Sequence, residues 1–142
     1  MTEGHNLQDE PQNTSKKNEL LLTALWKHCN LLLEEGLTYD DYAQELGYLL
    51  FLKIADEQTK RPFDKPSIVP HKYAWQSLLS LQGLDLLNHY RSVIEALRQD
   101  PGLPGVIFRK AKSRIDNPAQ LHQLIMLIDS GIWYSQEPLI RE

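Results

Sequence analysis

The chain has 142 residues, a formal net charge of −4, 42% hydrophobic residues and 24% charged residues, which is typical of a single globular domain. Its acidic balance excludes binding to nucleic acid through overall charge, so any DNA contact requires a local basic patch. The single cysteine, Cys29, excludes an internal disulfide, and neither a signal peptide nor an apolar run near the roughly 20 residues of a membrane span is present, so we expect a cytoplasmic protein without membrane contact.

Residues 1–14 are polar and show no apolar periodicity, so they are predicted to form a disordered amino-terminal arm. A helical domain is expected over residues 15–135. Its first helix has Thr14 or Ser15 as a candidate cap, and Gly36 follows it as a candidate left-handed cap. The apolar stripe of this helix has spacings of three and four and consists of Leu21, Leu22, Leu25, Trp26, Cys29, Leu32 and Leu33.

The second helix, over residues 38–60, is the strongest structural signal in the chain. Thr38 is its expected cap, and acidic residues at 40 and 41 complement the positive end of the helix. Residues 46–54 are apolar nearly all the way round, and a helix of this kind must be covered by other helices. Pro62 cannot continue the helix and is expected to terminate it.

Prolines at 62, 66 and 70 predict an extended connector, which is followed by a short helix over 73–81. Further apolar stripes predict helices over 86–97 and 106–115. Asn117 and Pro118 are typical of a helix start, and a last helix is expected from there to about residue 128. The predicted fold class is therefore all-α, a compact bundle of about five to six helices around the buried helix 38–60.

Reactive groups are sparse in this sequence. No histidine pairs with another histidine, a cysteine or an acid at metal-ligand spacing. His28 and Cys29 are neighbours on a helix and point about 100° apart, so a small buried side chain is the better interpretation of Cys29. Glu45 and the pair at 56–57 are interpreted as solvated charges. We therefore predict no catalytic residue, no metal site and no cofactor site in this chain.

Two groups of residues are candidates for binding. Between Pro101 and His122 there are four basic residues and one acidic residue, Asp116. On a predicted helix these bases could grip DNA phosphates, or they could form the solvated side of an amphipathic helix. Among the aromatic residues, Trp26 and Trp75 are expected in the core. The DNA-binding candidates are Arg109, Lys110, Lys112 and Arg114, and the interface candidates are Trp133 and Tyr134.

Several short motifs in series resemble a known protein family. They are Leu25-Trp26-Lys27, Thr38-Tyr39-Asp40-Asp41-Tyr42, Glu45 to Asp56, Trp75-Gln76-Ser77-Leu78-Leu79, Gly105-Val106-Ile107-Phe108, Asn117-Pro118-Ala119-Gln120-Leu121, Leu124 to Asp129 and Trp133-Tyr134-Ser135. In this order they resemble the amino-terminal helical domain of the modification (M) subunit of type I restriction-modification DNA methyltransferases. The resemblance covers residues 20–135.

The resemblance implies a parent enzyme that methylates adenine N6 in DNA with S-adenosylmethionine, a site-specific adenine-specific DNA-methyltransferase. The family's catalytic domain uses an Asn-Pro-Pro-aromatic loop and a glycine-rich cofactor loop, and neither occurs in this sequence. Asn117-Pro118-Ala119 lacks the second proline and the aromatic residue, and a helix start explains it. The resemblance therefore implies a non-catalytic domain that is inactive alone, with residues 136–142 as a tail leading toward a missing methyltransferase domain.

The same resemblance implies that the domain helps to assemble subunits and to close them around double-stranded DNA. Its implied partners are a specificity subunit and a second modification subunit, with a restriction subunit as a further candidate. An alternative hypothesis is a free-standing helical protein-interaction module that does not touch DNA. No family motif assigns individual contact residues, so the basic residues at 109–114 are candidates from charge alone.

Overall fold

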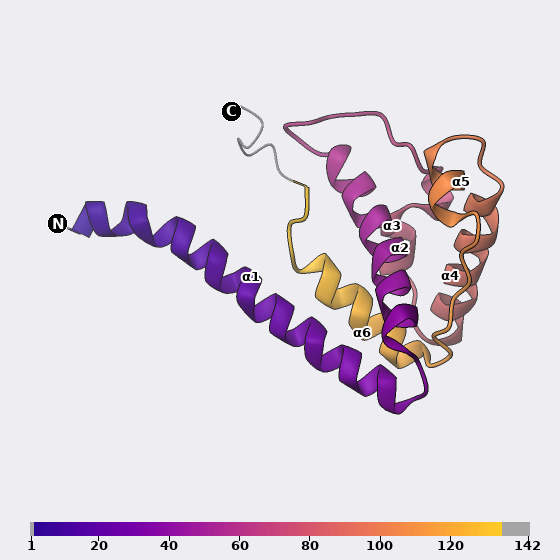
Figure 1. Cartoon of the computed structure of the whole chain (residues 1–142). Coiled ribbons are helices and arrows are strands. Elements are labelled where there is room, and N and C mark those ends of the chain that lie inside the picture. Colours follow the sequence, from indigo (N-terminus) through magenta and orange to yellow (C-terminus); the bar gives the residue numbers. More distant parts are fainter. Residues whose placement is uncertain (1, 135–142) are drawn as a thin grey trace.

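The computed structural model describes the backbone of residues 2–134 and the side chains of residues 18–134. All regular elements in this part of the chain are helical, which confirms the all-α prediction (Figure 1). The predicted tail at 136–142 lies outside the described residues. The elements are α1 (Thr2–Glu34), α2 (Tyr39–Gln58), the 3-10 turn η1 (His71–Tyr73), α3 (Trp75–Leu79), α4 (Gly83–Arg98), α5 (Leu103–Phe108) and α6 (Pro118–Asp129).

The helix α2 is the enclosed centre of the bundle, as predicted. It begins with a reciprocal capping box, in which the Thr38 hydroxyl accepts the backbone N–H of Asp41 at 3.0 Å and the Asp41 carboxylate accepts that of Thr38 at 3.0 Å. α1, α3 and α6 pack against it, and none of the residues 48–59 is exposed. A helix that is apolar on most sides is stable only with this degree of cover.

The helix α1 differs from its prediction at the amino terminus. The helix starts at Thr2, so residues 2–14 are helical where a disordered arm was expected. Thr14 and Ser15 lie inside the helix, so their prediction as caps is wrong. Extending a formed helix costs far less than nucleating one, and the packed part of α1 supplies the nucleus. In Figure 1 the amino-terminal half of α1 projects away from the other helices. Its other end is as predicted, because Gly36 has φ +105°.

The remaining helices complete the core around α2. α4 buries the apolar side chains along one of its faces. α6 begins where predicted, and the Asn117 side chain accepts the backbone N–H of Ala119 at 2.9 Å. Trp75 and Leu49 are both 0% exposed, whereas Trp26 is 61% exposed, so the expectation of a core position is confirmed for Trp75 and wrong for Trp26. Over residues 2–134, no helix combines the length and apolarity needed to cross a membrane.

Candidate functional site

Glu45 on α2 has a buried carboxylate that links the centre of the bundle to residues 109–114, which we call the basic segment. Glu45 is 0% exposed. Its Oε1 atom accepts a hydrogen bond from the Tyr90 hydroxyl at 2.6 Å, and its Oε2 atom accepts one from the backbone N–H of Arg114 at 2.6 Å. The interpretation of Glu45 as a solvated charge is therefore wrong, because both of its oxygens serve buried or partly buried donors.

The surroundings of Glu45 shift its titration. Burial raises the pKa of Glu45, and the hydrogen bonds from Tyr90 and Arg114 act in the opposite direction. Burial also raises the pKa of Tyr90 well above its ordinary value, and the charge of Glu45 adds to that rise. Tyr90 therefore keeps its proton and remains a donor, so Glu45 acts as a structural link between α2, α4 and the basic segment.

The basic segment is not the helix that the sequence predicted. α5 ends at Phe108, the next two residues form a turn, and residues 111–117 have no regular secondary structure. The expected pairing of bases on adjacent helix faces is thus wrong, although the segment remains on the surface. All four predicted DNA-binding candidates are exposed: Arg109, Lys110, Lys112 and Arg114.

Buried contacts explain why this segment leaves the helical path. The backbone N–H of Arg114 binds the carboxylate of Glu45 instead of a carbonyl one turn earlier in the chain. Ala111 and Ile115 are 2% and 0% exposed, so the segment is held to the core at two points. Tertiary contacts of this kind outweigh a weak local helix preference. Lys112 and Arg114 lie between these two buried residues, and their side chains are exposed although the backbone is fixed.

Two arginines of α4 join the basic segment and were not identified from the sequence. Arg91 and Arg98 are seven residues apart, which places them on the same side of α4. That spacing is the signal that could have identified them once α4 was placed beside residues 109–114. Together with the segment they border a surface hollow of about 360 Å³, which is lined by Arg91, Ile94, Glu95, Arg98, Lys112, Ser113 and Asp116.

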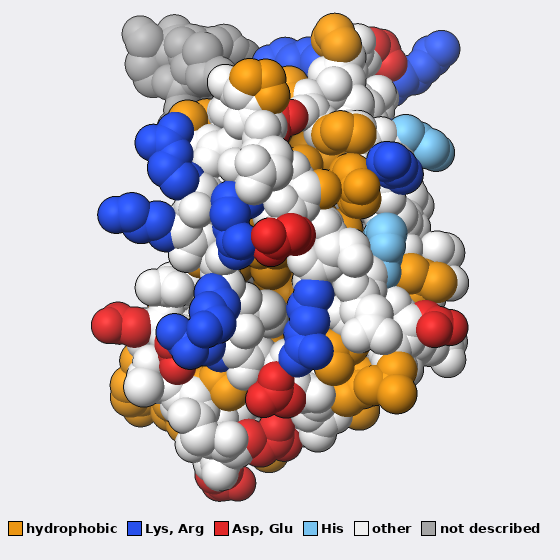
Figure 2. Space-filling view, turned by 90° about the vertical axis from the view of Figure 1, so that its right-hand side faces the viewer, with side chains coloured by type: hydrophobic (Ala, Val, Ile, Leu, Met, Phe, Trp, Pro, Cys, Tyr) orange, Lys and Arg blue, Asp and Glu red, His pale blue; other side chains and the backbone are white. Residues whose placement is uncertain are grey.

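Some of these cations already have carboxylate partners. Figure 2 shows the face in question, where blue side chains gather and a few red ones lie among them. Within residues 18–134, Arg109, Lys110 and Lys112 form no ion pair, so their charges are directed to solvent. The paired cations are Arg91 with Asp116 at 2.8 Å, Arg98 with Glu95 at 2.8 Å and Arg114 with Asp41 at 3.8 Å.

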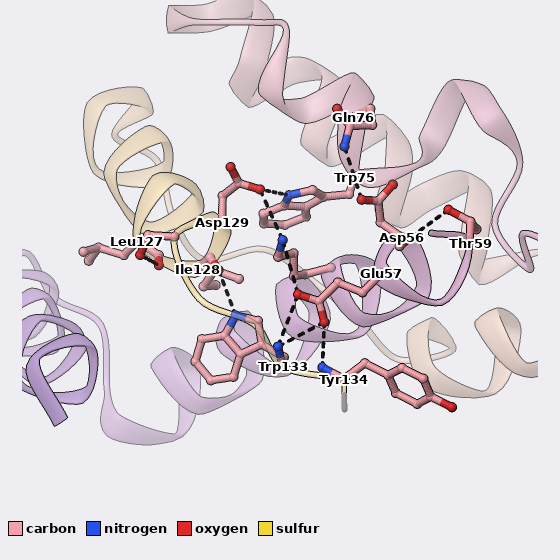
Figure 3. Close-up of polar contacts among 12 residues, drawn as sticks. Asp56, Glu57, Thr59, Trp75, Gln76, Leu127, Ile128, Asp129, Trp133 and Tyr134 are labelled. Atoms are coloured by element: carbon pink, nitrogen blue, oxygen red, sulfur yellow. Dashed lines mark hydrogen bonds and ion pairs between the residues drawn. The ribbon is translucent and has the colours of Figure 1, made fainter. Parts of the chain in front are cut away.

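The predicted interface residues Trp133 and Tyr134 are held by internal contacts (Figure 3). The Glu57 carboxylate accepts the backbone N–H of Trp133 at 3.0 Å and that of Tyr134 at 2.6 Å. The indole N–H of Trp133 donates to the carbonyl of Ile128 at 2.8 Å. Glu57 is thus an anchor, and its interpretation as part of a solvated helix end is wrong. A role of the two aromatic residues at an interface stays a prediction.

A charged network fixes this end of the bundle. Lys53 is 9% exposed, and its Nζ atom lies 3.3 Å from Glu57 and 3.4 Å from Asp129. The indole N–H of Trp75 donates to Asp129 at 2.8 Å. A buried cation needs such partners, because an unpaired one is strongly destabilising. The network links α2, α3 and α6 and holds the residues that follow α6 against α2.

The side chains that the sequence analysis weighed for catalysis can be placed in the structure. Among residues 18–134, no three side chains of histidine, cysteine, aspartate or glutamate come together in a way that could hold a metal ion. Cys29 is 1% exposed and His28 is 2% exposed. Burial raises the pKa of the Cys29 thiol and lowers the pKa of His28. The thiol is therefore neither ionised nor accessible, which agrees with its interpretation as a small core side chain.

Comparison with known proteins gives close matches to one group of enzymes. The chain is 33% identical over 119 residues to the StySJI methylase subunit of a type I restriction enzyme from Salmonella typhimurium, and 34% identical to the StySPI methylase subunit from Salmonella potsdam. The chain is homologous to type I restriction enzyme methylase subunits. Another such subunit, the EcoKI methylase subunit of Escherichia coli K12, is 33% identical. No model of a known protein family matches the chain.

A solved structure supports the homology at the level of the fold. The crystal structure of the type I restriction enzyme EcoKI M protein superposes with a TM-score of 0.65 at 32% identity, covering 83% of this methylase homologue and 24% of that protein. In sequence, the chain spans 22% of each of the three methylase subunits, and the match covers 83% of the chain. The resemblance stated from the motifs is therefore confirmed, over a match that spans about a fifth of each of these relatives.

Proposed function

We propose that this chain is the non-catalytic amino-terminal helical domain of a type I restriction-modification methylase subunit, and that it serves subunit assembly and closure around DNA. The observation that carries the proposal is the similarity to the EcoKI M protein over 83% of the chain at 32% identity. The fold supports the proposal, because an enclosed helical bundle with a fixed basic surface suits a domain that holds subunits together around DNA. The proposed location is the cytoplasm.

The non-catalytic assignment follows from what adenine-N6 methylation requires. The reaction needs a methyl donor, for which the proposed parent enzyme uses S-adenosylmethionine, and a pocket for a base turned out of the double helix. This sequence contains neither the Asn-Pro-Pro-aromatic loop nor the glycine-rich loop of that chemistry. Asn117, the nearest match, uses its side chain to accept the backbone N–H groups of Ala119 and Gln120. It therefore has the role of a helix cap.

The proposed contact with double-stranded DNA is through phosphates. Arg and Lys side chains that reach phosphate oxygens position a protein on DNA without reading its sequence. Lys112 and the two arginines of α4 suit this role because they border one surface hollow, and Arg114 suits it because its backbone N–H is bound by the buried Glu45. The proposed partners that would read sequence and complete the clamp are a specificity subunit and a second modification subunit, with the restriction subunit as a further candidate.

The first test concerns the cofactor. Calorimetric titration of the 142-residue chain with S-adenosylmethionine is expected to give no binding heat, because we propose that the cofactor site belongs to another part of the parent enzyme. A full-length homologous methylase subunit, titrated under the same conditions, is the positive control. Micromolar affinity of the chain for S-adenosylmethionine would contradict the non-catalytic assignment.

The second test concerns DNA. Replacing Lys112 and Arg114 together with alanine is expected to weaken binding to a DNA duplex and to reduce the slope of log affinity against log salt by about 0.9 for each phosphate that the variant no longer neutralises. The matched control, Lys60→Ala with Lys72→Ala, makes the same change of charge at exposed positions outside this surface. Fluorescence anisotropy over a series of salt concentrations measures both slopes.

The same measurement separates the two functional hypotheses. If the double variant and its control bind DNA equally, the clamp is not formed by this surface. If, in addition, the unaltered chain binds duplex DNA negligibly while binding a partner subunit tightly, the interaction module without DNA contact is the correct assignment.

A further inference from the structure

The outer face of α5 is apolar, although this helix lies on the surface. Leu103, Val106 and Ile107 are 54%, 58% and 39% exposed. Their spacings of three and four residues place them side by side on one face of the helix. A surface helix normally presents polar residues to water on its outer side. These three branched side chains therefore form an apolar surface that the described part of the chain leaves open.

The inner face of α5 holds this surface in a fixed orientation. Pro104, Gly105 and Phe108 are buried, and Phe108 packs against the rings of Tyr48 and Phe51 on α2. Gly105 is required here, because a Cβ atom at this position would overlap the backbone carbonyl of Asp100. The helix thus cannot rotate to hide its outer side chains without breaking this packing. A rigid apolar surface loses little conformational entropy on binding a partner.

Positive charge borders the apolar surface. Lys110 lies three and four residues after Ile107 and Val106, and Arg109 continues the backbone turn at the end of α5. Within residues 18–134 neither cation has a carboxylate partner. Asp100, which precedes α5, directs one carboxylate oxygen to the backbone N–H of Gly102 at 2.7 Å and forms no ion pair with either cation. The surface therefore has an apolar centre and an unneutralised basic edge.

We propose that Leu103, Val106 and Ile107, together with Arg109 and Lys110, form a docking surface for an acidic, apolar-centred face of a partner protein. We name this group of five residues the α5 surface. Protein interfaces combine an apolar centre with charged residues at the rim, and arginine is enriched there. DNA fits less well, because phosphates would neutralise the two cations but leave three branched apolar side chains in water. Charge complementarity gives the partner its acidic edge.

This assignment deepens the proposed assembly role and rests on it, and it divides the basic residues between two surfaces. Arg91, Arg98 and Lys112 remain with the hollow beside α4, and Arg114 follows Lys112 in the same segment; a phosphate backbone is their expected ligand. Arg109 and Lys110 are assigned to the α5 surface. The specificity subunit is the partner to which we assign the acidic face, because the proposed assembly requires contact with it.

The experiment measures binding of the 142-residue chain to the purified specificity subunit of its own system by calorimetry. The variant Leu103→Ser with Val106→Ser is expected to weaken binding at least about tenfold, because both substitutions remove apolar area that the complex would bury. The matched control is Leu84→Ser at the start of α4, where the side chain is 67% exposed. It is expected to bind within about twofold of the unaltered chain.

A second variant tests the charge. Lys110→Glu is expected to weaken binding to the specificity subunit and to do so most at low salt, where the interaction of exposed charges is least screened. It keeps the apolar residues and alters one exposed side chain, so it remains informative if the serine variant fails to fold. Far-UV circular dichroism and thermal melting of each variant report on folding. Affinity for a DNA duplex is expected to be unchanged by the serine variant.

Three outcomes overturn the assignment. Binding of the serine variant and of Lys110→Glu within twofold of the unaltered chain removes the α5 surface from the interface and leaves the assembly role intact. Loss of DNA affinity in the folded serine variant, with subunit binding kept, means that the surface contacts nucleic acid. Absence of any binding between the unaltered chain and the specificity subunit contradicts the proposed assembly role and this surface with it.

Discussion

Replacing Leu49 with alanine is expected to lower the free energy of unfolding by about 2–5 kcal/mol, the usual cost of removing a large side chain from a core. Leu49 is 0% exposed and lies in the middle of α2. Its neighbours come from a bundle that covers this helix closely, so the surrounding side chains can fill the space only in part. The expected loss is a large share of the about 5–15 kcal/mol that stabilises a typical domain.

Urea denaturation followed by circular dichroism measures this loss. The matched control is Leu84→Ala on α4, because Leu84 is 67% exposed and its truncation leaves no cavity. The control is expected to change stability by no more than about 0.5 kcal/mol. If the two variants lose equal stability, then α2 is not the enclosed centre of the protein.

The parts of the fold that could be predicted are those fixed by local chemistry. Thr38 with Asp41 starts α2, Asn117 with Pro118 starts α6, and Gly36 ends α1 in the left-handed conformation. Each of these signals acts within a few residues, so a sequence displays it directly. The burial of α2 by other helices could also be predicted from local sequence, because a helix that is apolar nearly all the way round has no side suited to water.

The parts that could not be predicted depend on contacts between distant residues. The basic residues 109–114 have the composition of a helix, but the buried carboxylate of Glu45 binds the backbone of Arg114 and draws the segment out of helical geometry. Glu45 itself looks like a surface charge in sequence, because nothing local announces the hydroxyl of Tyr90 on another helix. Charge patterns in sequence do not reveal which acids have buried partners.

The candidate site shows the same division. The sequence identified four exposed bases by their local excess, and their exposure is confirmed. It did not identify Arg91 and Arg98, because their proximity to Lys112 arises from the packing of α4 beside the segment. Glu57 was also misjudged, since the backbone groups that it binds lie after α6 and more than seventy residues away. Aromatic character and spacing likewise placed Trp26 in the core, whereas its side chain is exposed and stacks on the ring of Tyr39.

Replacing Glu45 with alanine is expected to destabilise the protein and to release the basic segment. The hydroxyl of Tyr90 and the backbone N–H of Arg114 would both lose their acceptor, and each buried donor left without one costs about 1–3 kcal/mol. The matched control is Gln44→Ala, an exposed neighbour on α2, which is expected to change stability little. Hydrogen–deuterium exchange is expected to become faster at residues 111–117 in the Glu45 variant and to stay unchanged in the control.

The pH dependence of stability tests the buried charge separately. Burial raises the pKa of Glu45 in the folded protein above the about 4.3 of an unfolded glutamate. Between these two pKa values the folded state binds more protons than the unfolded state, so rising pH lowers stability through this group. The difference in unfolding free energy between the unaltered chain and Glu45→Gln is therefore expected to shift in favour of the variant as pH rises from about 4.3 through the raised pKa. A difference that stays constant over this range, measured by urea denaturation at a series of pH values, would mean that Glu45 titrates as an ordinary surface carboxylate.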